Sequence, residues 1–474
     1  MKRRVIKVLI LLPVLYLLAF TTQSVITYMH ARDYVAQLSG EYDRATLDNQ
    51  SVALASDVDR LFWLLNFPVA KQITQIAGLD FNPIRDEVTA VIRASSWLVG
   101  ADAPKRYMIA FQNSAEARGT GGILGAFAII ELNKSSFSVV RTGSNSVLKW
   151  LKDVPVKVPE EFTKLYGKNP AIFQNSNLSP HFPYGAEIWM GIWKEHFGEQ
   201  LDGVIAVDPS ALSYVLKATG PITLESGEVI TSENVVSETL QKAYKRYEKD
   251  NNARKQYLVD ILDASASKIT SGQYSKIEMV RAIKQGLIEN RILMYSRDTP
   301  AERELAAVLL GGYLDKAPNN EFRAVIQNID ASKLDYYLDR DVVIESKSCD
   351  KVAQTQVRVR VTNTLKSGKG LPAYVLTRAD KGKPADLVTG AHRFKLFIYG
   401  PTNSVLVSVS RENRTEKLGG ASTERGRPIY VSDIDLAPGE SEELLANFAG
   451  GVGKITFVDQ PLVRPTSLTI KGGC

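Results

Sequence analysis

The N-terminal 28 residues constrain this chain most, because a basic tip precedes its longest apolar run. Lys2, Arg3 and Arg4 come shortly before an apolar stretch from Val8 to Tyr28. As a helix that stretch is about 30 Å long, which is enough to cross a bilayer. A cleaved signal peptide has a similar pattern, but the cleavage motif is weak and we favour an uncleaved anchor. The positive-inside rule then predicts a single-pass protein of the cell membrane, with residues 1–28 as tip and anchor and the bulk extracytoplasmic.

The composition of the whole chain is that of ordinary globular domains. Of its 474 residues, 44% are hydrophobic and 23% are charged, which excludes a disordered chain. Only one apolar segment is long enough to span, which excludes a polytopic membrane protein. The net charge of +6 is spread without a block of Lys or Arg, so we expect no nucleic-acid partner. The two cysteines and four histidines lack metal-binding spacing, and we expect no zinc site.

Hydrophobic periodicity divides the part that follows the anchor. Residues 29–103 predict a helical stalk, because apolar positions recur near a 3.6-residue period. Residues 104–330 interleave short apolar runs with amphipathic ones, which is typical of an α/β layered domain. Asp208 and Pro209 are predicted to begin a helix that Gly220 ends, with Asp208 as its cap rather than a ligand. Strands are predicted over 107–111, 126–130, 137–140 and 203–207, and further helices over 186–197, 231–247 and 254–269.

Residues 331–474 lose the helical pattern and predict an antiparallel β-sandwich of immunoglobulin-like type. Cys349 follows its first strand and Cys474 ends the chain. Because export makes oxidation available, we expect a disulfide between them; an intermolecular bond or two free thiols are the alternatives. The β-like runs are 342–345, 355–362, 394–399, 404–408, 429–432 and 467–470.

Two basic segments are candidate ligand sites. Arg118 precedes a glycine-rich turn at 119–122, whose backbone N–H groups can approach an anion. A tight turn without a ligand is the alternative there. Arg246 and Arg254 lie at neighbouring helix ends and can clamp a diphosphate, whereas a solvated helix face is the alternative. If the three arginines converge, we expect them to form a phosphate clamp. The alternative is that each pairs with a local carboxylate, such as Glu116 for Arg118 or Asp250 for Arg254.

Three longer motifs carry a resemblance to a known family. Their sequences are FQNSAEARGTGG at 111–122, DGVIAVDP at 202–209 and ASKLDYYL at 331–338. In this order they resemble a bacterial membrane-anchored family, domain-of-unknown-function family 4012, over about residues 100–470. That resemblance implies no established activity.

The order of the parts is also similar, more distantly, to the LytR–CpsA–Psr (LCP) phosphotransferases. These enzymes move glycopolymers from polyprenyl pyrophosphate onto peptidoglycan, and the similarity covers about residues 105–270. It implies an LCP-like α/β domain in which Arg246 and Arg254 hold the pyrophosphate and Gln256 assists. The aspartates that hold the metal in LCP enzymes are missing after the first and third predicted strands. We therefore expect a degenerate metal site and no cofactor, because the motifs do not support a magnesium ion.

The resemblances together define the expected function. We expect an extracytoplasmic cell-envelope protein that binds a polyprenyl-pyrophosphate-linked glycopolymer, with LCP-like transfer as the catalytic version of this hypothesis. A non-catalytic envelope scaffold, with the sandwich as its interaction module, is the alternative. The expected partners are the membrane, a polyprenyl-phosphate-linked glycan or peptidoglycan, and an envelope protein.

Overall fold

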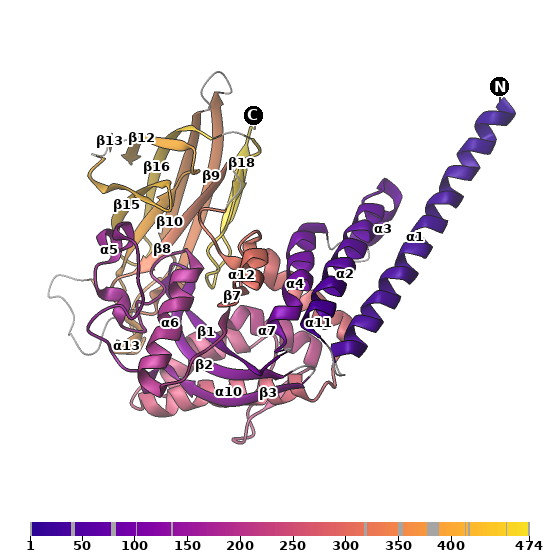
Figure 1. Ribbon diagram of the computed structural model, residues 1–474. Coiled ribbons are helices and arrows are strands. Elements are labelled where there is room, and N and C mark those ends of the chain that lie inside the picture. Colours follow the sequence, from indigo (N-terminus) through magenta and orange to yellow (C-terminus); the bar gives the residue numbers. More distant parts are fainter. Residues whose placement is uncertain are drawn as a thin grey trace. The chain divides into compact units, whose positions relative to one another are not determined.

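The structure is a computed structural model, in which the described part of the chain forms two compact units (Figure 1). The first unit comprises residues 1–106, 131–138 and 296–308, and the second comprises 107–130, 139–295 and 309–474. The residues that the structure describes are 2–38, 43–76, 82–100, 102–133, 136–316, 320–348, 354–376, 388–412, 414–415, 418–451 and 453–472.

The first unit is helical, as the periodicity of residues 29–103 predicts. Tyr34 of α1 packs with Leu47 and Leu54 of α2 to form a small core. Asp43 caps α2 by accepting a hydrogen bond from the backbone N–H of Thr46. The helices are α1 (Lys2–Leu38), α2 (Arg44–Leu65), α3 (Pro68–Ile76), α4 (Arg85–Leu98) and α12 (Thr299–Leu305), with a 3₁₀ turn η1 (Asn82–Ile84).

The predicted membrane anchor falls partly on side chains that the structure does not describe. Within the described part of the chain, no helix combines the length and apolar character needed to cross a membrane. The backbone of Val8 to Tyr28 is helical within α1, but the side chains of residues 1–15 lie outside the described set. The anchor therefore stays a prediction.

The α/β part of the second unit is built on a five-stranded sheet with strand order β3-β2-β1-β4-β7. Strands β1 and β4 are parallel and pair from Tyr107 with Gly203 to Phe111 with Val207. All four predicted strands are found, and the prediction missed β7. The strands are β1 (Lys105–Arg118), β2 (Gly121–Asn133), β3 (Ser136–Ser144), β4 (Gly203–Val207) and β7 (Leu293–Ser296), with a separate hairpin of β5 (Ile222–Thr223) and β6 (Val229–Ile230).

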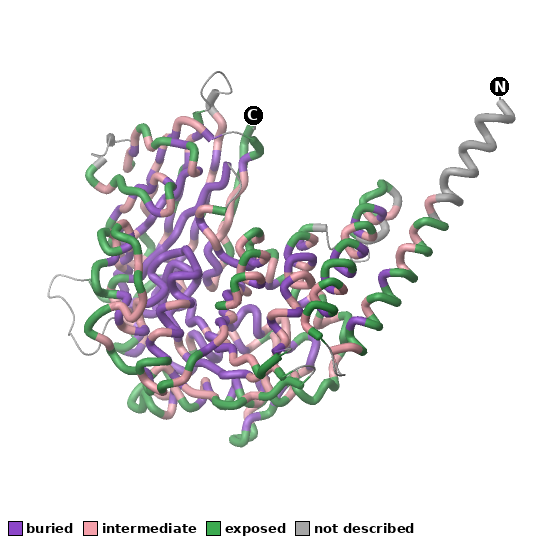
Figure 2. The backbone as a smooth tube through the Cα atoms, viewed as in Figure 1, coloured by how far each residue is buried: buried purple, intermediate pink, exposed green. Residues whose placement is uncertain are grey.

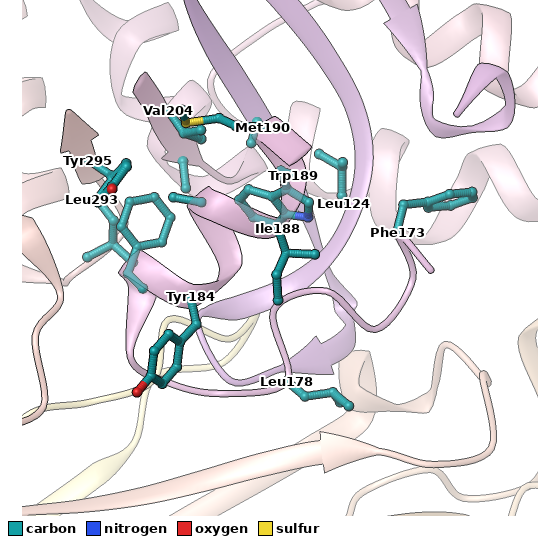
Figure 3. Packing of buried hydrophobic residues seen from close by; sticks show 14 of the residues in the cluster. Leu124, Phe173, Leu178, Tyr184, Ile188, Trp189, Met190, Val204, Leu293 and Tyr295 are labelled. Atoms are coloured by element: carbon teal, nitrogen blue, oxygen red, sulfur yellow. The ribbon is translucent and has the colours of Figure 1, made fainter. Parts of the chain in front are cut away.

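Helices cover both faces of this sheet, and β1 is therefore buried on both sides. Met108 and Ala110 belong to a core that also contains Trp189 of α6, and Figure 3 shows part of this cluster. On the opposite face, Leu212 of α7 and Ile261 of α10 form a second core. The helices are α5 (Glu160–Tyr166), α6 (Phe182–Phe197), α7 (Pro209–Thr219), α8 (Val235–Ser237), α9 (Ala243–Arg246), α10 (Asn251–Thr270) and α11 (Lys276–Ile288), with 3₁₀ turns η2 (Asn145–Val147), η3 (Asn169–Ala171) and η5 (Leu309–Gly311).

The start and end signals of α7 act as the sequence predicts. The Asp208 carboxylate accepts a hydrogen bond from the Ala211 N–H at 2.8 Å, Pro209 occupies the first turn and Gly220 ends the helix at a φ of 79°. Asp208 is therefore a helix cap. The helix predicted over 231–247 differs, because a π-helical turn, η4 (Glu238–Lys242), separates α8 from α9. Such turns interrupt the regular hydrogen-bond ladder and occur often beside functional sites.

The remaining residues form two sheets that share one core, which appears as buried purple strands in Figure 2. The six-stranded sheet has the order β13-β12-β16-β10-β9-β18, and the five-stranded sheet has the order β14-β15-β11-β8-β17. The elements are β8 (Glu321–Asn328), β9 (Leu338–Ser348), β10 (Gln354–Asn363), β11 (His392–Tyr399), β12 (Ser404–Arg411), β13 (Arg414–Thr415), β14 (Ala421–Glu424), β15 (Arg427–Leu436), β16 (Ser441–Gly450), β17 (Thr456–Phe457) and β18 (Ser467–Lys471), with η6 (Leu334–Tyr337), α13 (Ala373–Leu376) and η7 (Leu418–Gly420).

This two-sheet domain begins earlier than the predicted boundary at residue 331. Strand β8 pairs with β11, so residues 321–328 belong to the sheets and not to the helical tail of the α/β domain. All eight residues of β8 are buried, including the polar residues Glu321, Arg323 and Gln327. The immunoglobulin-like type of the domain stays a prediction.

The two cysteines, Cys349 and Cys474, lie outside the described residues. The strands that precede the two cysteines are neighbours, since β18 pairs in parallel with β9 up to Lys471 opposite Glu345. The predicted disulfide is therefore untested.

Candidate functional site

One cavity of about 620 Å³ is lined by both parts of the second unit. This volume lies within the roughly 300–1,000 Å³ of ordinary small-molecule sites. Its walls come from β1 and β2, from α9 and α10, from the loops between residues 145 and 178, and from β8, β11 and α13. The lining residues used below are Asn113, Glu116, Arg118, Gly125, Asn145, Trp150, Asn169, Gln174, Asn175, Tyr244, Asn251, Arg254, Lys255, Leu258, Lys333 and Tyr374.

A buried ion cluster forms the floor of the cavity. Glu116 and Arg118 are two residues apart on β1, so their side chains lie on the same face of the strand. Nη2 of Arg118 donates to Oε1 of Glu116 at 2.8 Å, and Nζ of Lys333 donates to Oε2 at 2.6 Å. All three side chains are buried. Burial disfavours the ionised carboxylate, but Lys333 and Arg118 outweigh it and hold the pKa of Glu116 below its usual range.

Arg254 forms a second cationic wall, stacked on aromatic rings. Its side chain is 6% exposed. The guanidinium carbon lies 4.5 Å from the ring centroid of Tyr244 and 5.3 Å from that of Tyr374, and the two rings are themselves stacked at 5.9 Å. Nζ of Lys333 lies 4.8 Å from the Tyr374 centroid. Cation–π contacts of this kind hold both cations beside the same pair of rings.

Arg254 has a neutral hydrogen-bond partner. Its Nη2 donates to Oδ1 of Asn251 at 2.5 Å, and no described carboxylate lies within ion-pair distance of it. Next to it along α10, the half-buried Lys255 has its pKa lowered by burial and by the charge of Arg254. The described lining therefore places three buried cations, Arg118, Lys333 and Arg254, against the single carboxylate of Glu116. Buried charges are normally paired, so this excess of positive charge indicates a site for an anion.

The structure brings together two of the four predicted phosphate-binding residues, Arg118 and Arg254. Arg246 lies elsewhere, because its guanidinium is paired with Glu228 at 2.7 Å and with Glu238 at 2.8 Å. Gln256 donates to Asp260 on the exposed side of α10. Arg254 and Gln256 are two positions apart, which is about 200° around a helix, so they cannot face the same wall. A clamp made of three arginines is therefore not what the structure assembles.

The glycine-rich turn after Arg118 serves the packing of the chain. A Cβ on Gly119 would lie 2.2 Å from the carbonyl oxygen of Leu178, and one on Gly122 would lie 2.2 Å from that of Asn113. Both glycines are therefore required by close backbone approach. Among the described residues, the turn itself does not line the cavity, whereas Arg118 does.

Sequence reasoning named Glu116 only as a local partner of Arg118, which the ion pair confirms, and it missed Lys333 and the tyrosine pair. Two of these residues stood inside the motifs that carried the family resemblance, Glu116 in 111–122 and Lys333 in 331–338. The structure shows why those motifs go together: Lys333 pairs with Glu116, and Oδ2 of Asp335 accepts the Ala117 N–H at 3.0 Å. The signal available in the sequence was that one motif contains a glutamate and the other a lysine, which are able to form an ion pair.

The cavity does not fit a magnesium ion. Magnesium prefers carboxylate and water oxygens, and the only carboxylate among the described lining residues is engaged by Arg118 and Lys333. In the described part of the chain, no group of three or more His, Cys, Asp or Glu side chains could hold a metal ion. No step that depends on a metal is therefore derived for this site.

Comparison with known proteins finds one family model that matches part of the chain. Residues 102–244 match the model of the family described as protein of unknown function (DUF4012). The match contains the motifs at 111–122 and 202–209, whereas the motif at 331–338 lies beyond it. No curated protein matches the sequence.

Some solved structures are similar, at low identity. The protein gbs0355 of Streptococcus agalactiae is 12% identical, covers 43% of this chain and 74% of its own, and has a TM-score of 0.27. A Legionella pneumophila protein described as nutrient binding is 7% identical, covers 29% and 44%, and has a TM-score of 0.18. At these scores neither likeness bears on function. None of these findings confirms the similarity to LCP enzymes.

Proposed function

We propose that the cavity of the second unit binds the phosphate groups of a polyprenyl-pyrophosphate-linked glycopolymer. The observation that carries the proposal is the charge of the lining, in which Arg118, Lys333 and Arg254 are buried against one carboxylate. A pyrophosphate neutralises the two uncompensated positive charges. It also offers several oxygen acceptors to the guanidinium of Arg254 and the ammonium of Lys333, whereas Arg118, whose N–H groups all have protein acceptors, contributes its charge.

An apolar pocket next to the cavity supports a lipid-linked anion over a free one. This pocket has a volume of about 40 Å³ and shares Asn113, Gly125 and Leu258 with the cationic cavity. It lies where β1 and β2 meet α7 and α10, beside the π-helical turn η4. An amphiphilic ligand can place its phosphates against the cations and the start of its hydrocarbon chain against this lining. The other lining residues are Phe111, Gln112, Ala126, Pro209, Leu212, Thr239, Leu240, Ile261 and Leu262.

The geometry supports binding better than transfer. A phosphotransferase needs a base or a metal to activate the attacking hydroxyl group. Glu116 is held ionised by two cations that engage both of its oxygens, which disfavours it as a base, and the cavity does not fit magnesium. We therefore propose a binding protein, and LCP-like transfer is not part of the proposal.

The cellular setting belongs to the same proposal. A lipid-linked glycopolymer is met at the outer face of the cytoplasmic membrane. This setting agrees with the predicted anchor, the extracytoplasmic location and the immunoglobulin-like domain as a contact surface for an envelope partner. The alternative function, an envelope scaffold without a ligand, needs no cationic cavity.

Calorimetric titration of the full-length protein with farnesyl pyrophosphate tests the proposal. Arg254→Met keeps an unbranched, flexible side chain and removes its charge, and we expect a loss of roughly 10- to 150-fold in affinity, or about 1.5–3 kcal/mol. Arg246→Met is the matched control, because Arg246 lies on a neighbouring helix outside the cavity and should leave the affinity unchanged. Equal losses for both variants, or no binding by the wild type, would reject the site and favour the scaffold.

A further inference from the structure

One wall of the cavity carries no charge at all. The segment from residue 145 to residue 178 contributes ten lining residues, and every one is an amide, an aromatic or an aliphatic side chain. All cations of the described lining come from other segments. These lining residues are Asn145, Trp150, Leu165, Tyr166, Asn169, Ile172, Phe173, Gln174, Asn175 and Leu178. Charge is therefore segregated within the cavity, and a ligand that fits it has an anionic part and a neutral polar part.

The amides of this wall have unused hydrogen-bonding capacity. Oδ1 of Asn145 and Oε1 of Gln174 are buried and have no hydrogen-bond partner among the described residues. The amide nitrogen of Asn145 is engaged, since it donates to the Leu124 carbonyl at 2.7 Å. A buried acceptor without a donor costs free energy, about 1–3 kcal/mol in typical proteins. Neither oxygen has appreciable accessible surface, so a ligand hydroxyl group donates to them once the amide side chains turn toward the cavity.

Trp150 supplies an apolar surface on the same wall. Its side chain is 65% exposed, whereas Trp189 and Trp193 of the same unit are almost fully buried. A large aromatic ring left in water at the edge of a cavity is available to a ligand with an apolar face. Hydroxyl groups around a ring together with an apolar C–H face are the chemistry of a pyranose sugar.

Arg118 connects the neutral wall to the cationic floor. Its Nε donates to the Gln174 carbonyl at 2.8 Å, and its Nη2 donates to Oδ1 of Asn175 at 3.3 Å as well as to Glu116. The two walls therefore meet at one guanidinium. A sugar on the neutral wall would lie directly next to a phosphate held by the cations.

We propose that Trp150, Asn145 and Gln174 form a subsite for the sugar ring that is attached to the phosphate. This inference rests on the proposed function, and it adds which part of the ligand is recognised and by which residues. The indole stacks on the C–H face of the ring, and the two amide oxygens accept hydrogen bonds from its hydroxyl groups. No bond is formed or broken in this step.

Two kinds of probe separate this inference from the proposed function. Farnesyl pyrophosphate carries no sugar, and the second kind carries glucose, galactose or N-acetylglucosamine on its terminal phosphate. We expect the full-length protein to bind at least one sugar-bearing probe about tenfold more tightly than farnesyl pyrophosphate. Trp150→Ala should remove that gain, so that the sugar-bearing probe binds no better than farnesyl pyrophosphate, and Trp150→Phe should restore part of it.

Trp63→Ala is the matched control, because Trp63 is 63% exposed but belongs to the first unit. It should leave the affinity for both kinds of probe unchanged. A wild-type protein that binds farnesyl pyrophosphate but gains nothing from any of the three sugars would overturn the sugar subsite alone. Equal losses for both kinds of probe in Trp150→Ala would overturn it as well. Absence of binding for every probe would overturn the proposed function and the subsite together.

Discussion

Replacing Glu116 with glutamine changes the charge of the cavity floor with little change in shape. In the wild type the carboxylate pairs with Arg118 at 2.8 Å and with Lys333 at 2.6 Å, and all three side chains are buried. Glutamine keeps one acceptor oxygen but leaves two buried cations without a negative partner. Removing one partner of a buried ion pair typically costs about 3–5 kcal/mol, because the remaining charge stays desolvated.

We expect this loss of stability to lower the urea concentration at the midpoint of unfolding of the second unit. With a urea dependence of about 1–3 kcal/mol per molar, 3–5 kcal/mol corresponds to a midpoint shift of at least about 1 M. Tryptophan fluorescence reports the transition, since Trp189 and Trp193 lie in the core of this unit. The surface variant Glu160→Gln is the control, because the pair of Glu160 with Lys164 is exposed and should contribute nothing measurable.

The Glu116→Gln variant should also bind anions more tightly. A simple packing defect would not have this effect, so the measurement distinguishes the two causes of lost stability. One more uncompensated positive charge in the cavity should raise the affinity for farnesyl pyrophosphate by at least about fivefold, or about 1 kcal/mol. Bound ligand should then recover part of the lost stability. A variant with the wild-type urea midpoint, or one that binds farnesyl pyrophosphate more weakly, would refute the assignment of Glu116 as the counter-charge of the site.

Two further predictions concern pH and the cysteines. The carboxyl group of Glu424 accepts hydrogen bonds from Ser179, Tyr166 and Tyr399, and burial raises its pKa. Its contribution to stability is therefore present below the pKa of an unfolded glutamate, about 4.3, and is lost as the pH rises through the folded pKa. Glu424→Gln should therefore flatten the fall of the melting temperature between about pH 4.3 and 8, and a fall as steep as that of the wild type would contradict this. Cys349 and Cys474 should be recovered as one linked peptide pair by non-reducing mass spectrometry, because β18 runs beside β9; two alkylatable thiols would contradict it.

Glu116 itself should affect stability on the acid side. Its pKa in the folded protein lies below the usual range, so its contribution is present above the pKa of an unfolded glutamate, about 4.3, and is lost as the pH falls through the lower folded value. The Glu116→Gln variant lacks this group, and its acid unfolding should show a correspondingly weaker pH dependence below that value.

Local signals were readable from the sequence where neighbouring residues decide the outcome. Asp208, Pro209 and Gly220 define both ends of α7, because a cap and a left-handed glycine act within one helical turn. The four predicted strands of the α/β domain were found for a similar reason, since each is a short apolar run. Strand β8 was missed because Glu321, Arg323 and Gln327 leave an apolar run of only three residues, although the whole strand is buried.

The candidate site was only half readable, because its members are distant in the chain. Arg118 and Arg254 were predicted and do line one cavity. Arg246 instead pairs with Glu228 and Glu238, which the sequence analysis did not identify as its partners. Lys333 meets Glu116 across 217 positions of sequence. No periodicity or spacing rule reaches over such a separation.

The sequence by itself therefore determined the helical first segment, the α/β order of elements, the mostly β composition of the last segment, and the family motifs. These features depend on interactions within a few residues, such as capping, period and turn chemistry. The tertiary structure alone decided which charges face one another. Burial places two motifs, one helix and a pair of tyrosines around a single cavity, and only there do three cations share one carboxylate. The excess of positive charge arises because distant residues are buried together in one region of low dielectric, and the sequence does not show which residues share that region.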